Sequence, residues 1–247
     1  MLSILSRKAV AASGFVERYV LSLVYLFFAW SEFHTLALLS LDSSGPAGIE
    51  GIAFIHAVKH MTLLLLQLFI GVLLLFGKNP ASQPRNLREL LVPLAASFFL
   101  LTYNAIRLLP PSLRENLLPH EMQMPCAVAA LVLGIVGAAI STWGVASLGR
   151  SFGIFVSVRE IVLEGPYRHV RHPIYLGYFC IGAGLVLVNA SVAIFVIVPI
   201  HVLLLIYRAH LEETRLAESS ESYREYMQRT GFIFPRFRGA LRGSRDR

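Results

Sequence analysis

The chain has 247 residues, of which 55% are hydrophobic and 15% are charged, and its mean hydropathy is +0.63. Soluble domains are about 25% charged, so this composition excludes an ordinary soluble domain and indicates an integral membrane protein. The formal net charge of +7 does not indicate nucleic-acid binding, because the basic residues gather at the ends of apolar segments, as membrane anchors that contact lipids do.

Apolar runs predict about six membrane helices in an all-α fold. In chain order they cover residues 16–41, 56–76, 89–109, 124–148, 173–188 and 192–211. The fifth run is shorter than the roughly 20 residues that cross a bilayer. A tight turn at 189–191 follows it directly, so the last two runs are predicted to form a helical hairpin. The polar, basic tail predicts a cytoplasmic amphipathic helix that includes Leu216, Tyr223 and Tyr226.

The distribution of Lys and Arg sets the predicted orientation. These residues concentrate in segments 7–18, 78–88, 150–171 and 215–247, which all fall on one side of a six-helix arrangement. The opposite loops hold few of them, so the positive-inside rule places both termini of a multi-pass protein in the cytoplasm. Cys126 and Cys180 lie in apolar runs with neither disulfide nor metal-ligand spacing. We therefore expect no metal.

A basic stretch, GPYRHVRHPIYLG at 165–177, stands at the start of the fifth run. His172 precedes a proline and should be extended, and Pro173 suits the first position of a helix. The free N–H groups at such a helix start favour a carboxylate or a phosphate, and Arg168 and Arg171 would add donors. Taken alone, the stretch fits a positive-inside anchor that contacts lipid phosphates about equally well.

A second polar stretch, YRAHLEETRL at 207–216, ends the sixth run. Arg208 and Glu212 are four residues apart and can pair on one helix face, and Glu213 lies on the neighbouring face. Adjacent acids at a membrane boundary are costly unless they face protein, water or a cation, although spacing alone slightly favours an ordinary solvated face. The hairpin returns this stretch to the side of His172. Together they offer donors for a carboxylate and acids for hydroxyls or a positive charge, features that match an adenosyl sulfonium cofactor.

The joint pattern of RHPxYxG, a hydrophobic hairpin and Glu-Glu resembles the isoprenylcysteine carboxyl methyltransferase and phospholipid methyltransferase superfamily. The further positions that share its pattern are Gly165, Pro166, Tyr167, Arg208, Tyr223, Tyr226, Pro235 and Arg236. The resemblance covers about 148–237. It implies a methyltransferase core at 124–237 without a Rossmann fold, preceded by membrane helices of unassigned role at 1–123 and followed by a basic, disordered tail at 238–247.

The resemblance also implies a cofactor, S-adenosyl-L-methionine, and roles for individual residues. The expected cofactor-binding residues are Tyr167, His172, Pro173, Tyr175, Gly177 and Glu213, together with backbone near 162–165. Arg208 and Glu212 are the expected catalytic residues that face a lipophilic methyl acceptor, whose tail enters between membrane helices. A carboxylate acceptor needs no base and would be held by Arg208. An amine would have to lose a proton, which Glu212 could accept.

Several alternatives stay open at this stage. The acceptor is expected to be a carboxylate of the isoprenylcysteine type, with a phospholipid amine or a small thiol as alternatives. Membrane sterol reductases, which use NADPH, share an RHP-type motif, but LEETRL and SYREYM favour methyl transfer. A non-catalytic scaffold is the third alternative.

His201 is expected to be a hydrogen-bonded interior histidine rather than an acceptor contact. Arg150 is expected to be an anchor or to close the site, and Gly134 and Gly137 are expected to allow close helix contact.

Overall fold

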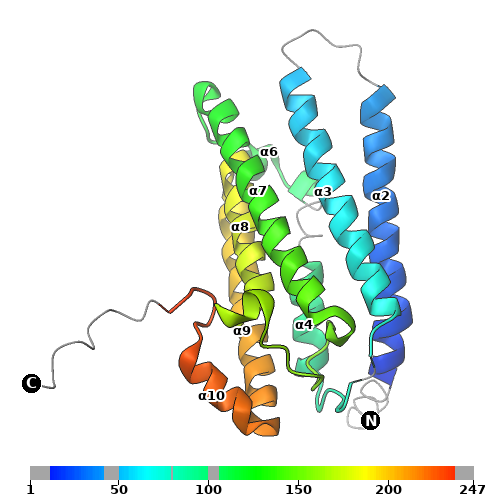
Figure 1. Cartoon of the computed structure of the whole chain (residues 1–247). Coiled ribbons are helices and arrows are strands. Elements are labelled where there is room, and N and C mark those ends of the chain that lie inside the picture. Colours follow the sequence, from blue (N-terminus) through cyan, green and yellow to red (C-terminus); the bar gives the residue numbers. More distant parts are fainter. Residues whose placement is uncertain (1–11, 42–49, 79, 100–105, 237–247) are drawn as a thin grey trace, which may run out of the picture.

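The computed structural model describes residues 12–41, 50–78, 80–99 and 106–236, and over these ranges it is helical, with isolated β-bridges but no strand. In chain order the elements are η1 (Val16–Leu21), α2 (Ser22–Leu41), α3 (Glu50–Leu75), α4 (Arg88–Phe98), η2 (Ile106–Leu108), α6 (Pro111–Arg114), α7 (His120–Leu148), η3 (Gly149–Ser151), η4 (Gly165–Arg168), α8 (Pro173–Val188), α9 (Val192–Ser219) and α10 (Glu221–Arg229). The all-α prediction is confirmed. The long helices form an elongated bundle (Figure 1).

Helix length and composition support an integral membrane protein. Three described helical stretches are long and apolar enough to cross a bilayer, namely Ala12–Leu38, His120–Ser151 and Val192–Ser219, and two shorter apolar ones are His60–Leu75 and Pro173–Val188. Large apolar side chains such as Leu23, Phe27 and Trp30 are exposed on α2, as lipid-facing positions are. The predicted third span is described as an 11-residue α4 and the η2 turn. Each piece is too short to cross a bilayer, and residues 100–105 lie outside the description, so the count of six spans stays a prediction.

The hairpin of α8 and α9 is confirmed, and α8 begins at Pro173 and ends at Val188 as predicted. The Ser191 hydroxyl caps α9 by accepting a hydrogen bond from the Ile194 N–H. The helix continues to Ser219 rather than ending near residue 211, because the polar stretch after Tyr207 consists largely of good helix formers. Helix α9 therefore carries Arg208, Glu212 and Glu213 on a continuous, rigid element.

Helices α7 and α8 make the most extensive helix contact of the described fold, and glycines allow it. A Cβ atom at Gly177 would lie 2.1 Å from Ser141 Oγ and 2.4 Å from the Gly137 carbonyl oxygen. A Cβ at Gly137 would lie 2.5 Å from the Gly177 carbonyl oxygen, so the predicted contact role of Gly137 is confirmed. For Gly134 the same prediction is wrong, since a Cβ there would meet no described atom within 4 Å.

The segment after α10 returns to the basic stretch. The Arg171 N–H donates to the Gly231 carbonyl at 2.8 Å and the His172 N–H donates to the Phe232 carbonyl at 3.1 Å. Val170 and Gly231 form a parallel β-bridge. Figure 1 shows α10 at the same end of the bundle as the start of η1. The predicted tail at 238–247 lies outside the described residues.

Candidate functional site

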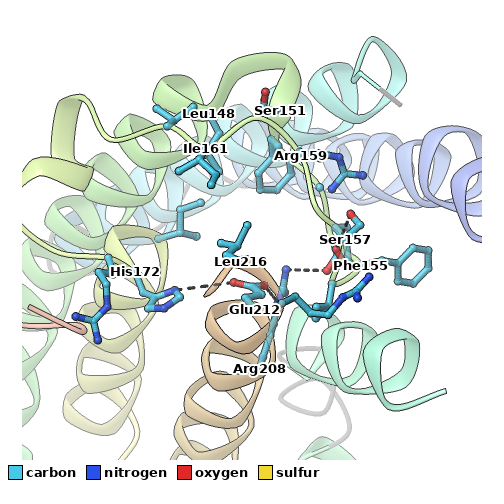
Figure 2. Close-up of a pocket in the computed structure, with 18 of the residues that line it drawn as sticks. Leu148, Ser151, Phe155, Ser157, Arg159, Ile161, His172, Arg208, Glu212 and Leu216 are labelled. Atoms are coloured by element: carbon cyan, nitrogen blue, oxygen red, sulfur yellow. Dashed lines mark hydrogen bonds and ion pairs between the residues drawn. The ribbon is translucent and has the colours of Figure 1, made fainter. Parts of the chain in front are cut away.

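A cavity lies at the end of the bundle where the two polar stretches meet. The residues of its wall come from α8, α9, α10, the 151–162 loop, α2 and α4. Five of the predicted site residues line it, namely Tyr167, His172, Tyr175, Arg208 and Glu212. Figure 2 shows His172 on one side of Glu212, and Arg208 on the side of the loop that carries Phe155 and Ser157. The predicted convergence of the hairpin ends is therefore present.

Arg208 is fixed at the centre of the wall. Its Nε donates to Glu212 Oε1 at 2.9 Å, its Nη1 to Ser97 Oγ at 2.8 Å and its Nη2 to the Ile154 carbonyl at 2.9 Å. The residue is only 5% exposed. Because the three acceptors come from α9, α4 and the loop, the guanidinium has a fixed position and orientation. An arginine has five N–H groups, and these contacts use three of them.

Glu212 connects Arg208 to the start of α8. The same Oε1 atom that accepts from Arg208 also accepts from Tyr175 Oη at 2.7 Å. The Tyr175 ring is stacked on the His172 ring, with centroids 5.2 Å apart and planes 6° apart. The Glu212 side chain is 24% exposed, and it presents its carboxylate to the cavity. This carboxylate can accept a hydroxyl or an ammonium group.

Glu213 faces away from the cavity wall. Its carboxylate accepts from Arg171 Nε and, at 3.1 Å, from His172 Nε2, with 7% of its side chain exposed. The Arg171 guanidinium also donates to the carbonyls of Met227 and Thr230. Glu213 and Arg171 therefore tie α9, the basic stretch and the C-terminal segment together. Arg168 is exposed and lies outside the cavity wall.

Pro173 and Gly177 are buried within α8 and do not line the cavity, although both lie in the described ranges. Pro173 occupies the first helical position after His172, as predicted. Gly177 faces α7, where the close approach to Ser141 and Gly137 requires a residue without a side chain. Packing of α8 against α7 accounts for the glycine, and a direct contact with a cofactor stays a prediction.

Aromatic side chains cover the side of the cavity near α10. Tyr226 Oη donates to the Tyr167 carbonyl at 2.6 Å, and the rings of Tyr223 and Tyr226 lie 5.5 Å apart. Burial is the main cause that raises the pKa of Tyr167, Tyr223 and Tyr226 above its usual 10.0. All three hydroxyls are therefore neutral near pH 7, and their ring faces suit an aromatic or cationic ligand.

Sequence reasoning missed the part that the N-terminal helices play. The arginines that line the cavity are each paired with a glutamate, in the pairs Arg159–Glu17, Arg171–Glu213, Arg208–Glu212 and Arg215–Glu89. Glu17 and Glu89 belong to η1 and α4, and Glu17 also accepts from the Phe155 N–H at 2.9 Å. Both acids are buried. An acid at a membrane boundary needs a partner, which is the signal in the sequence that could have identified them.

The structure shows the contacts of His201 and Arg150, two residues for which the sequence left alternatives open. His201 Nε2 lies 3.0 Å from the Ala96 carbonyl, and the ring is stacked on Phe99. The prediction of a hydrogen-bonded interior histidine is confirmed. Arg150 donates from Nε to the Phe76 carbonyl at 3.0 Å and lies outside the cavity wall. It links η3 to the end of α3.

The fold and the cavity define a helical membrane protein with a buried polar site at one end of the bundle. Residues 129–218 match the model of the isoprenylcysteine carboxyl methyltransferase (ICMT) family. This match confirms the resemblance to that superfamily over α8, α9 and most of α7, and it supports a membrane methyltransferase. No curated protein matches the chain. The matched segment spans roughly a third of the chain and leaves out α2, α4 and α10, which also contribute residues to the cavity wall.

Proposed function

We propose that this chain is an S-adenosyl-L-methionine-dependent methyltransferase of the membrane–cytoplasm boundary. The proposed acceptor is lipophilic and carries a carboxylate of the isoprenylcysteine type. One observation carries the proposal: Arg208, Glu212, Tyr175 and His172 form a connected cluster in the wall of a single cavity. The family match over 129–218 gives independent support for methyl transfer.

The chemistry of the cavity wall fits this cofactor. S-adenosyl-L-methionine carries a carboxylate, an ammonium, an aromatic base and a sulfonium, and it would supply a methyl group that is already activated. The wall offers a carboxylate at Glu212 and ring faces at Tyr167 and Tyr223, and it includes guanidinium groups. Tyr167, His172 and Tyr175 would hold the cofactor directly. We assign Pro173, Gly177 and Glu213 an indirect part, because they fix the position of α8 and of His172.

The protein's own residues would contribute alignment and a dry environment. The two remaining N–H groups of Arg208 would hold the acceptor carboxylate by charge-assisted hydrogen bonds. Glu212 would keep that guanidinium and Tyr175 in register. Fixed geometry of this kind contributes several powers of ten to a displacement rate. The burial of Arg208, Tyr175 and Ile154 supports exclusion of water from the reacting groups.

The position of the site is consistent with a cytoplasmic mouth. The cavity lies at the end of the bundle that holds α10 and the start of η1 (Figure 1). The sequence concentrates Lys and Arg in the segments of this end, and such segments face the cytoplasm. We therefore propose that both termini are cytoplasmic and that the acceptor tail lies among the membrane helices.

Binding of S-adenosylhomocysteine tests the proposal. The detergent-purified chain should bind S-adenosylhomocysteine in a calorimetric titration and should not bind NADPH. Absence of the first binding would refute methyl transfer, and binding of NADPH would favour the reductase class. A labelled-methyl assay with a prenylcysteine analogue and a total lipid extract then separates a carboxylate acceptor from a phospholipid amine. A non-catalytic scaffold would show neither binding nor transfer.

A further inference from the structure

Two polar side chains of the cavity wall come from the N-terminal helices, whose role the sequence leaves unassigned. They are Tyr25 of α2 and Ser97 of α4. Both lie well outside the matched segment 129–218. The wall that they form faces Arg208, whereas the tyrosines of α10 lie near Tyr167. The cavity thus has one polar wall from the N-terminal helices and another from the C-terminal segment.

Ser97 positions Arg208 and lies beside a second hydroxyl. Its Oγ accepts from Arg208 Nη1 at 2.8 Å, and the hydroxyl is within hydrogen-bonding reach of Tyr25. The neighbouring Ala96 and Pro93 are buried in α4, and Ala96 packs in one apolar cluster with Leu205 and Ala209 of α9. The serine is therefore held on a rigid surface against the helix that carries Arg208.

Tyr25 adds a second hydroxyl beside this contact. The residue is 8% exposed, and it belongs to the apolar cluster that includes Leu21 and Ile154. Its hydroxyl lies beside that of Ser97 and in the vicinity of Tyr178 and Arg208. A buried tyrosine hydroxyl needs a hydrogen-bond partner, and the Ser97 hydroxyl supplies one, so this pair leaves one proton to donate beside the Arg208 guanidinium. Such a wall favours a ligand group that accepts hydrogen bonds.

We propose that Ser97 and Tyr25 are positioning residues for the methyl acceptor, so that the N-terminal helices determine which acceptor head group is used. The inference rests on the proposed methyl transfer. Ser97 orients the guanidinium of Arg208, and the one proton that the hydrogen-bonded Ser97–Tyr25 hydroxyl pair leaves over is donated to the same oxygen-bearing group that Arg208 holds. Cofactor affinity is set on the other side of the cavity, by the α8 start and the C-terminal segment. Acceptor use and cofactor binding are thereby separable by mutation.

The test compares acceptor kinetics with cofactor affinity in the full chain. Ser97→Ala and Tyr25→Phe should each lower kcat/KM for N-acetyl-S-farnesylcysteine about tenfold, the size expected for a lost hydrogen bond to a charged group. The affinity for S-adenosylhomocysteine should stay within about twofold of wild type, because Ser97 and Tyr25 make no hydrogen bond, within the described residues, to Tyr167, His172 or Tyr175, which we assign to the cofactor. Ser97→Thr keeps the hydroxyl and should recover most of the activity. Tyr25→Phe keeps the ring and its packing, so it carries the test if Ser97→Ala does not fold.

Matched controls exist at the junction of η1 and α2. Ser22 of α2 is fully buried but donates to the Tyr19 carbonyl one turn earlier, and Tyr19 of η1 is 45% exposed. Ser22→Ala and Tyr19→Phe should leave the acceptor kinetics unchanged.

The outcomes separate this inference from the proposed function. Unchanged acceptor kinetics in Ser97→Ala and Tyr25→Phe would overturn the inference while methyl transfer stands. A parallel loss of S-adenosylhomocysteine affinity would also overturn it, because the two residues would then serve the cofactor. If the wild-type chain binds no S-adenosylhomocysteine, or methylates neither the probe nor a total lipid extract, the proposed function fails and the inference fails with it.

Discussion

Arg171 and Glu213 are 42 residues apart in sequence and form a buried ion pair, with 9% and 7% of their side chains exposed. The same guanidinium binds the carbonyls of Met227 and Thr230. One side chain thus joins α9, the start of α8 and the segment after α10. The integrity of the cavity wall depends on this junction, since Tyr167, His172, Tyr223 and Tyr226 all lie next to it.

Arg171→Ala should destabilise the chain and abolish binding of S-adenosylhomocysteine. Removal of one partner of a buried ion pair costs about 3–5 kcal/mol, because the other charge stays buried. Unfolding in detergent, followed by circular dichroism, measures the loss of stability, and calorimetry measures the loss of binding. Arg168→Ala is the matched control, because Arg168 is three residues away and exposed. If both variants behave alike, the junction has no special part in the site.

Arg208→Lys should lower turnover at least a hundredfold while the affinity for S-adenosylhomocysteine changes less than about threefold. A lysine retains the charge but cannot reproduce the fork that binds Glu212, Ser97 and Ile154 together. Steady-state kinetics and calorimetry on the same preparation check the two halves of this prediction. Arg150→Lys, at an arginine outside the cavity, serves as the control. A large loss of cofactor affinity in Arg208→Lys would place Arg208 on the cofactor side.

The parts of the site that depend on local signals could be predicted from the sequence, whereas contacts between segments far apart in the chain could not. The limits of α8, the hairpin and the convergence of His172 with Arg208 and Glu212 follow from apolar run lengths and turn residues, which are local signals. The hydrogen bonds from Arg171 to the carbonyls of Met227 and Thr230 could not be predicted, because these residues are 56 and 59 positions away in the sequence. A positive charge near a helix start has the same sequence pattern whether it binds a ligand or the protein's own backbone.

The N-terminal contribution was missed for a related reason. Glu17 and Glu89 carry no motif, and their partners Arg159 and Arg215 are 142 and 126 residues away in sequence. The available clue was the free-energy cost of an unpaired acid at a membrane boundary, which indicates that each acid has a cationic or polar partner. Gly177 is a motif position for which the packing of α8 against α7 gives a sufficient reason, and its direct contact with a cofactor stays a prediction.

Gly177→Ala should destabilise the chain, because the new Cβ would lie 2.1 Å from Ser141 Oγ and 2.4 Å from the Gly137 carbonyl oxygen. Overpacking of this kind costs about 1–3 kcal/mol or more. Unfolding in detergent measures the effect. Gly134→Ala on the neighbouring helix α7 is the control, since its Cβ would meet no described atom within 4 Å and alanine favours the helix.

The double variant Gly177→Ala with Ser141→Ala sharpens that prediction. It removes the contact with Ser141 Oγ but leaves the backbone contact with Gly137, so it should recover part of the lost stability and not all of it. Equal stability of Gly177→Ala and Gly134→Ala would contradict the close packing of α7 against α8.

Alkaline pH should weaken the attachment of α10. Burial raises the pKa of Tyr167, Tyr223 and Tyr226 above its usual 10.0. As pH rises above 10, the unfolded chain releases these protons while the folded chain retains them, so the free energy of unfolding falls with pH. Below that interval the three residues add no pH dependence.

Tyr226→Phe should lower stability by about 1 kcal/mol at all pH values, because it loses the hydrogen bond to the Tyr167 carbonyl. It should also reduce the slope of stability against pH between about pH 10 and 11, measured by unfolding in detergent. A slope identical to that of wild type would show that Tyr226 is not the half-buried, protonated group that joins α10 to Tyr167.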